Sequence, residues 1–235
     1  METYVRDYES HSYSFTDAYT SLIRKVYVWM TLALVMTGLS AYYVATSPSL
    51  MLAIFSNSIV FYGLMIAEVG LVMWLSARIH KMSLASASLM FSIYAILNGV
   101  TLSSIFVLYT ASSIATTFFI TAGTFGVMAF IGTVTKTDLT KMGKILMMAL
   151  IGMLIAIFVN IFLGNGMLDI IISAVGVLVF TGLTAYDAQK IKAMLMECPN
   201  ADEQTQKLSV LGALSLYLDF INLFLYLLRF LGDRK

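Results

Sequence analysis

The chain has little charge, one cysteine, two prolines and two histidines in 235 residues. Charged residues make up 11% of it and apolar residues 60%. Soluble domains carry about 25% charged and about 45–50% apolar residues. A soluble chain this apolar could not cover its surface with polar groups, so lipid must be the solvent for much of the molecule. The single thiol, Cys198, excludes an internal disulfide.

The scarcity of histidine and lysine in the apolar segments excludes several membrane proteins. His11 and His80 lie in the polar N-terminal segment and at a loop, so a rhomboid-type serine protease has no histidine to use. A His-Glu-x-x-His metalloprotease sequence is absent. No lysine lies between Lys207 and Lys235, which excludes a retinal-binding opsin. The net charge of +1, with no basic stripe, gives no indication of a nucleic-acid partner.

Seven apolar runs have the roughly 20 residues that a helix needs to cross a bilayer. They are Val26–Thr46, Ser58–Ala77, Leu84–Tyr109, Ile114–Val134, Ile145–Leu163, Leu168–Gln189 and Leu208–Leu231. The runs are too long for strands and lack the alternation of a spanning barrel. Both prolines fall in connections, where no helical hydrogen bond is lost. The predicted fold is therefore an all-α, polytopic seven-helix transmembrane bundle, with the last helix central.

The predicted organisation is a cytoplasmic tail over residues 1–25, a membrane domain over 26–231 and a polar cytoplasmic loop over 192–207 within it. The tail carries charges of both signs and no apolar core, so it is not expected to be a cleaved signal. Residues 48–57 fit either a short interfacial helix or the start of the second span. Small residues four apart predict close helix packing, at Gly99 with Ser103 and at Ala122 with Gly126.

Lysine and arginine are distributed unequally between the two sides of the predicted bundle. Eleven of the 14 fall in the N-terminal tail or in the loops after the second, fourth and sixth spans. This predicts a cytoplasmic N-terminus and, with seven spans, an external C-terminus. Arg229, Arg234 and Lys235 would then lie outside, in mild conflict with the rule. A last segment that turns back into the membrane would remove the conflict.

Three ionisable residues lie inside predicted spans, where such residues are rare and usually functional: Glu68, Asp187 and Asp219. With a helical rise of about 1.5 Å per residue, Glu68 lies about 15 Å deeper than Arg78, and Asp219 about 16 Å from the cytoplasmic boundary. Asp187 lies near that boundary. The four side chains could therefore share the cytoplasmic half of the bundle. Asp169 and Arg229 fall at outer ends and are expected to reach lipid headgroups.

Asp219, Asn222 and Tyr226 lie on one helix face, which should point into the bundle. Two carboxyl groups close together in an apolar environment cannot both ionise cheaply, so they titrate as a unit. Such a group is either a satisfied structural network or a site that handles protons or cations. Carboxylate oxygens suit a hard cation such as Ca²⁺, but a closed cage would need more oxygens than the sequence offers. A permeation path is therefore expected rather than a metal storage site, and no cofactor is expected.

Two stretches resemble the Bax inhibitor family, the transmembrane Bax inhibitor motif proteins. Residues 216–232, which begin Leu-Tyr-Leu-Asp-Phe-Ile-Asn, are similar to the last helix of that family. Residues 184–191, Thr-Ala-Tyr-Asp-Ala-Gln-Lys-Ile, are similar to the end of its preceding helix. The seven-span plan extends the likeness over almost the whole chain. The short polar ends resemble those of bacterial members, which implies a bacterial inner (plasma) membrane.

The resemblance implies a pH-sensitive calcium leak across the membrane, and not an enzyme. It implies that Asp187 and Asp219 form a paired acidic sensor, with Tyr186 and Asn222 as supporting polar residues. It further implies that Arg78 latches Asp187 in the closed state and that Glu68 lines the pore. Pairing the aspartates requires residues 208–215 to be partly cytosolic helix. Ca²⁺, protons and lipid are the expected partners; the sequence specifies no protein partner and is compatible with a monomer.

Two other classes compete with the leak. A presenilin-like aspartyl protease would also place one aspartate in each of the last two spans. It would need a Gly-x-Gly-Asp element, whereas Asp219 follows Ser-Leu-Tyr-Leu. A non-transporting scaffold or regulatory binding protein is compatible with everything in the sequence. Flux measurements in liposomes separate the three classes.

Overall fold

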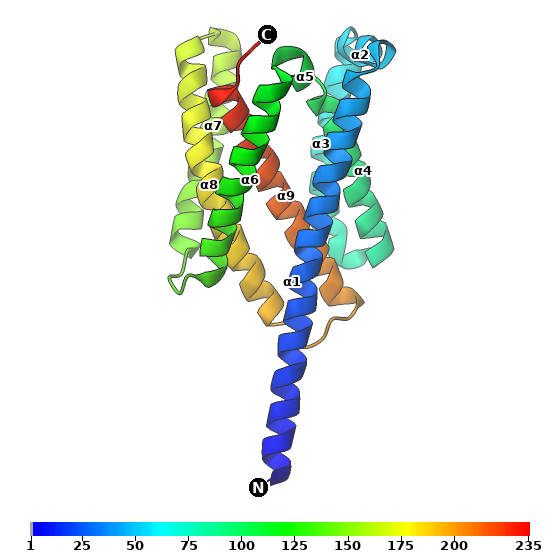
Figure 1. The fold of residues 1–235 in the computed structure, drawn as a ribbon, viewed down its shortest axis with the longest axis vertical. Helices are drawn as coiled ribbons and strands as arrows, with labels where there is room; N and C mark the ends of the chain where they lie inside the picture. Colours follow the sequence, from blue (N-terminus) through cyan, green and yellow to red (C-terminus); the bar gives the residue numbers. More distant parts are fainter. Residues whose placement is uncertain (1) are drawn as a thin grey trace. The chain divides into compact units, whose positions relative to one another are not determined.

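A computed structural model describes the backbone of residues 2–235 and the side chains of residues 17–235 (Figure 1). Over this range the chain forms nine α-helices and one 3-10 turn, without any strand. A single isolated bridge joins Tyr109 and Arg234. Seven helical segments are long and apolar enough to cross a membrane. The predicted class is confirmed: the protein is an integral, multi-pass, all-α membrane protein.

The chain packs as two compact units. Unit 1 contains Met1–Ser104 and Lys192–Leu214, and unit 2 contains Ile105–Ile191 and Ser215–Lys235. The last two long helices, α8 (Gly166–Met196) and α9 (Glu203–Leu231), contribute residues to both units.

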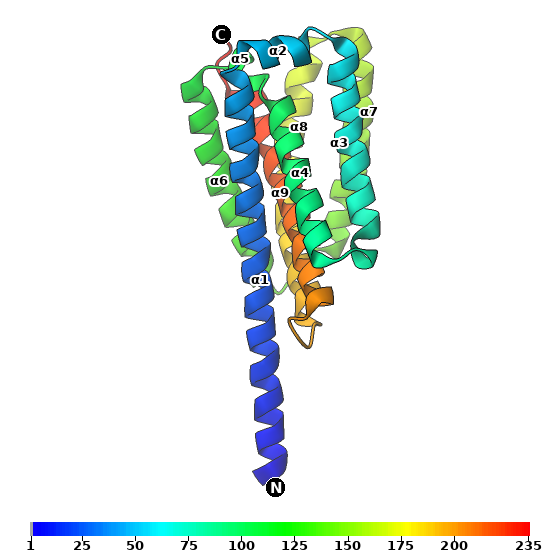
Figure 2. The same ribbon diagram turned by 90° about the vertical axis from the view of Figure 1, so that its right-hand side faces the viewer.

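Unit 1 is built on the pairing of its first and fourth helices. Its elements, apart from its parts of α8 and α9, are α1 (Glu2–Ala45), α2 (Pro48–Phe55), α3 (Ser58–Arg78), η1 (Ile79–Lys81) and α4 (Leu84–Leu102). Figure 2 shows α1 running along α4. The Thr37 hydroxyl donates to the carbonyl of Ala95 at 2.9 Å, and a Cβ on Gly99 would collide with the backbone of Thr37. The close approach predicted at Gly99 is therefore confirmed.

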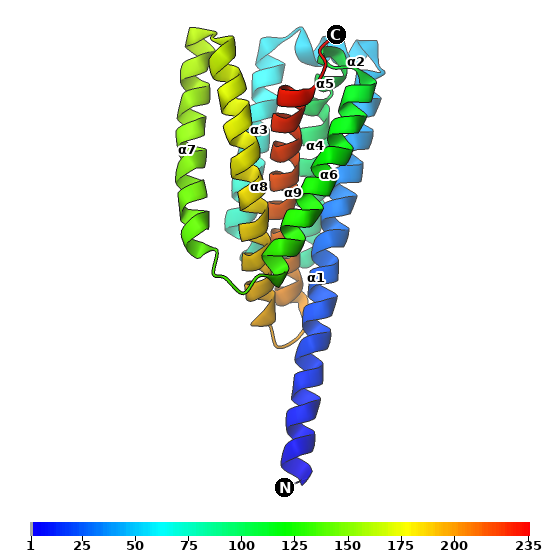
Figure 3. The same ribbon diagram turned by 60° about the vertical axis from the view of Figure 1, so that its left-hand side comes forward.

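Unit 2 contains α5 (Ile105–Leu108), α6 (Ala111–Val134), α7 (Thr140–Leu163) and the larger parts of α8 and α9. The turn between α7 and α8 uses Gly164 in the left-handed conformation, with φ 60°, which glycine adopts without steric cost. Figure 3 shows α7 lying beside α8. The close approach predicted at Gly126 is wrong, because a Cβ there would meet nothing within 4 Å in the described residues. The crowded glycine of α6 is Gly132, packed against the backbone of Ala185.

Several predicted boundaries differ from the structure. The third predicted span is not one helix, because α4 ends at Leu102 and α5 begins at Ile105. The hydroxyls of Ser103 and Ser104 donate to the carbonyls of Val100 and Thr101, and this local bonding competes with the regular helical pattern.

The polar segments are also more helical than their hydropathy suggests. In the predicted loop 192–207, α8 continues to Met196 and α9 begins at Glu203. The predicted tail is helical from Glu2 onward. The apolar stretch of α9 is 67% buried, and those of the other six membrane-crossing helices are at most 33% buried. The last helix is thus the most buried of the seven, as its predicted central place requires.

Candidate functional site

The two aspartates predicted to pair lie on facing surfaces of α8 and α9 within unit 2. The rings of Phe180 and Tyr226 stack with their centroids 5.7 Å apart, which fixes the register of these helices. Asp187 lies seven residues beyond Phe180, and Asp219 lies seven residues before Tyr226. Seven residues are close to two helical turns, so antiparallel helices in this register bring the aspartates to the same level and the same contact face. Their carboxyl groups interact electrostatically.

Asp219 is the more deeply buried of the two, with a relative exposure of 6%. Its Oδ2 atom is buried and has no hydrogen-bond partner among residues 17–235. Asp187 is half-buried. A carboxylate oxygen without a donor in an apolar environment is costly. This position therefore favours a bound proton or a cation over a bare charge.

The surroundings of the pair are apolar and tightly packed. The ring of Phe220, beside Asp219, makes edge contacts with Phe118 and Phe125 of α6. On α8, the backbone of Ala185 packs against Gly132 of α6 with no room for a Cβ. The apolar packing around the buried Asp219 lowers the local dielectric constant there.

The residues predicted to support the pair have other contacts. The Tyr186 ring packs over Gly143 of α7, and the Lys190 ammonium lies 6.0 Å from its centroid. The Asn222 amide donates to the carbonyl of Leu218 at 2.8 Å, within α9 itself. Among the described residues neither side chain donates to an aspartate. Their supporting role stays a prediction.

Glu68 lies in unit 1, in a small polar cluster between α3 and α4. It is buried, and its carboxylate accepts from the Thr101 hydroxyl at 2.9 Å and from the Asn98 amide at 3.4 Å. Asn98 and Thr101 were not predicted from the sequence. Their spacing of three residues places both on one face of an apolar helix, and this pattern could have identified them.

Arg78 is the last residue of α3 and is exposed. It belongs to unit 1 with Glu68, whereas Asp187 and Asp219 belong to unit 2. The structure therefore brings the two aspartates together within one unit. The shared group of four and the latch between Arg78 and Asp187 stay predictions.

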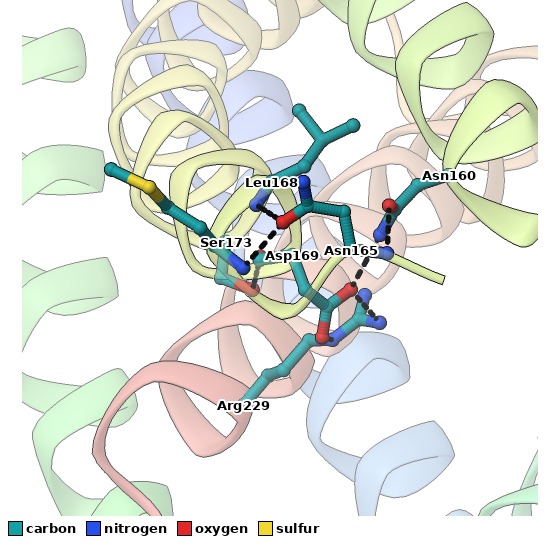
Figure 4. Close-up of polar contacts among 7 residues, drawn as sticks. Asn160, Asn165, Leu168, Asp169, Ser173 and Arg229 are labelled. Atoms are coloured by element: carbon teal, nitrogen blue, oxygen red, sulfur yellow. Dashed lines mark hydrogen bonds and ion pairs between the residues drawn. The ribbon is translucent and has the colours of Figure 1, made fainter. Parts of the chain in front are cut away.

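At the other ends of α8 and α9, Asp169 and Arg229 bind each other (Figure 4). The Arg229 Nε donates to one carboxylate oxygen at 2.9 Å, and its terminal nitrogen pairs with the other. The Asn160 amide adds a contact to the same carboxylate at 3.4 Å. The two side chains form a two-pronged ion pair that joins the helix ends, and the prediction that both charges reach lipid headgroups stays a prediction.

The helices that carry the pair continue well past it. Helix α9 begins 16 residues before Asp219, and α8 ends nine residues after Asp187, which are lengths of about 24 Å and about 14 Å. Residues 208–215, which the pairing requires to be partly cytosolic helix, lie within α9, and their place outside the membrane stays a prediction. Within the described residues no three His, Cys, Asp or Glu side chains are grouped as metal ligands would be.

Comparison with known proteins gives a consistent result. The family described as "Inhibitor of apoptosis-promoting Bax1" matches residues 20–235. The inner membrane protein YbhL of Escherichia coli is 49% identical over 212 residues, which cover 90% of this chain and 91% of that protein. An uncharacterized protein of Borreliella burgdorferi is 46% identical over 91% of this chain and 92% of its own length. One from Rickettsia prowazekii is 42% identical over 96% and 95%.

Proposed function

The chain belongs to the Bax inhibitor family, and from this membership and the buried aspartate pair we propose that it is a pH-sensitive calcium leak channel rather than an enzyme. The observation that carries the proposal is the position of Asp219, deep in unit 2 and opposite Asp187 with one oxygen unpartnered. The inner membrane name of YbhL supports a bacterial inner membrane as its location.

The chemistry of the pair supports a switch between two states. Two facing carboxyl groups in an apolar environment hold one proton between them more easily than two full charges. When the last proton leaves, the site needs a cation. Two carboxylates supply at most four of the six to eight oxygens that Ca²⁺ takes, so Ca²⁺ would bind in passing and not be stored.

In the proposed mechanism the Arg78 guanidinium competes with Ca²⁺ for the ionised pair. Paired with ionised Asp187 it would hold the path closed, and protonation of that aspartate would release it. The leak should then rise as the pH falls. Glu68, fixed by Thr101 and Asn98, would supply carboxylate oxygens elsewhere along the path.

The test is Ca²⁺ influx into liposomes that contain the purified protein, followed across roughly pH 6–8. The variants are Asp187→Asn and Asp219→Asn, which keep the shape and remove the charge. Asp138→Asn is the matched control. Asp138 is exposed in the loop between α6 and α7 and caps the amide of Thr140 at 2.9 Å, and asparagine caps as well as aspartate.

The parent and the control should show the same flux and pH profile, and both pair variants should lose the pH dependence. Arg78→Ala should raise the leak at neutral pH. Absent flux in the parent would leave a non-transporting scaffold as the better description. Unchanged profiles in both pair variants would overturn the role of the aspartates, and equal or reduced leak in Arg78→Ala would overturn the latch.

A further inference from the structure

The first turns of α9 hold the turn between α3 and α4 through a buried lysine. Lys207 has a relative exposure of 3%, and its ammonium donates to the carbonyls of His80 at 3.2 Å and Met82 at 2.9 Å. These carbonyls lie in and just after η1, the short helix that continues α3 beyond Arg78. Carbonyls at the end of a helix lack partners within it and carry partial negative charge, so an ammonium group suits them.

The same face of α9 also holds the start of α4. Glu203 lies four residues before Lys207, on the same side of the helix. Its carboxylate accepts from the amide of Leu84, the first residue of α4, at 3.0 Å. A carboxylate is the favoured partner at a helix N-terminus. Glu203 and Lys207 therefore bind the two sides of the α3–α4 turn. We call these two residues the clamp.

The start of α9, which carries the clamp, is also bound to α1. Two residues beyond Lys207, the Ser209 hydroxyl donates to the carbonyl of Leu22 in α1 at 3.0 Å. The start of α9 is thus bound to three other elements of unit 1. From there α9 runs without interruption to Asp219, 12 residues and about 18 Å beyond Lys207.

We propose that the clamp transmits the state of the aspartate pair to α3, with Lys207 and Glu203 as positioning residues of the channel. A change in the packing of Asp219 moves α9. The clamp carries this movement to the turn that directly follows Arg78, on the helix that also bears Glu68. This inference rests on the proposed leak function. Its physical premise is that a helix fixed at one end and switched in its middle acts as a lever between two sites.

Other ionisable groups surround the clamp and must be separated from it. His80 and Lys81 lie on η1, Asp202 directly precedes α9, and Arg78 ends α3. Histidine is the side chain that changes charge near neutral pH. A His80→Gln variant, which leaves the backbone acceptor of Lys207 in place, is therefore measured alongside. It should keep the parent's pH profile.

The first experiment is a double-mutant cycle on Ca²⁺ flux, with Lys207→Met and Arg78→Ala alone and together. Methionine keeps the length and apolar volume and removes the donor. In the parent, Arg78→Ala should raise the neutral-pH flux severalfold; in the Lys207→Met background it should change nothing, because α3 has already lost its link to α9. Glu203→Gln is the second variant. Glu203 is exposed, so this variant should fold normally, and it should weaken the pH response of the flux as Lys207→Met does.

Thr37→Val is the matched control for a loss of stability alone. It removes a buried hydrogen bond between helices of the same unit, the one from Thr37 to Ala95, without contacting the clamp. It should lower the thermal midpoint and keep both the pH profile and the response to Arg78→Ala. Additive effects of Arg78→Ala and Lys207→Met, or the same loss of response in Thr37→Val, would overturn the proposal.

The second experiment does not depend on flux. Hydrogen exchange reports the protection of residues 82–86, whose Leu84 amide is held by Glu203. In the parent, protection of this turn should change between roughly pH 8 and pH 6, and Asp219→Asn should abolish the change. Constant protection in both proteins would overturn the clamp even if the leak is real. If protection changes with pH in the parent but not in Asp219→Asn, and no Ca²⁺ flux is seen, the proposed role of the clamp stands and the proposed leak function is wrong.

Discussion

Two buried acids of the described chain, Asp219 and Glu68, differ in how their carboxylate oxygens are partnered. The Oδ2 of Asp219 is buried without a donor, while Glu68, also buried, has a hydroxyl and an amide donor for its carboxylate. A satisfied carboxylate is fixed in one state, whereas an unsatisfied one responds to a proton or a cation. The difference between these two acids is the reason that the proposed function assigns the pH response to Asp219 and not to Glu68.

The acids Glu68, Asp187 and Asp219 were predictable from the sequence, because an ionisable residue within a long apolar run can be recognised without knowing which face of the helix it occupies. Lys207 was not, because a lysine at the polar edge of a span looks like an ordinary interfacial charge. Its burial comes from the carbonyls of His80 and Met82, more than 120 residues earlier in the chain. No local pattern records a contact between a side chain and a distant backbone.

Gly132 gives a residue-scale prediction about packing around the site. A Cβ there would collide with the backbone of Ala185, which cannot move aside cheaply, so Gly132→Ala should lower stability by about 1–3 kcal/mol. Gly126→Ala in the same helix adds a methyl group to open space and should be neutral or stabilising by up to about 1 kcal/mol. Thermal denaturation in detergent measures both. Equal effects would show that α6 and α8 are not in close contact.

At the scale of elements, the apolar lengths predicted the spans well and the ends poorly. Hydropathy reports where lipid contacts the chain, but a helix continues into water wherever its residues favour it. The segment 192–207 contains lysine, methionine, glutamate and glutamine, all good helix formers, so α8 and α9 extend into it. The break between α4 and α5 was not predicted, because Ser103 and Ser104 lie within an apolar run and hydropathy does not show where a helix is interrupted inside such a run.

The start of α9 gives an element-scale prediction with a defined pH window. Asp202 accepts from the amide of Thr205 at 2.9 Å, and this bond holds the pKa of Asp202 below its ordinary value of 3.8. A carboxylate with a lowered pKa stabilises the fold above its ordinary pKa, and the contribution is lost as the pH falls through the lowered value. The first turn of α9 should therefore stay protected from hydrogen exchange down to about pH 4 and fray below it.

The control for this prediction is Asp202→Asn, which keeps a capping acceptor and has no charge to titrate. Its first turn should show no such acid transition. Fraying of the parent between roughly pH 6 and pH 8 would contradict the assignment. Fraying in that range would have to come from a group other than Asp202, and the Asp202→Asn variant would then show it as well.

At the scale of the whole molecule, the three basic residues near the C-terminus no longer argue against an external C-terminus. Arg229 is paired with Asp169, the Arg234 guanidinium lies 5.9 Å from the ring of Tyr109, and the Lys235 ammonium donates to the carbonyl of Phe106 at 2.7 Å. Helix α9 also runs unbroken to Leu231, so the last segment does not turn back. Charges engaged in such contacts are weak guides to orientation, and the remaining eleven favour a cytoplasmic N-terminus.

Orientation can be tested directly with single cysteines in a Cys198→Ser background. Ser56→Cys, after α2, and Ala111→Cys, at the start of α6, should react with a membrane-impermeant maleimide in intact spheroplasts. Thr137→Cys and Asn200→Cys should react only after permeabilisation. All four positions are exposed, so a difference in labelling reports the side of the membrane and not burial. A fully reversed pattern would place the N-terminus outside and invert the proposed direction of gating, because the end of α3 and the clamp would then face away from the cytoplasm. A mixed pattern would show that one of the seven apolar segments does not cross.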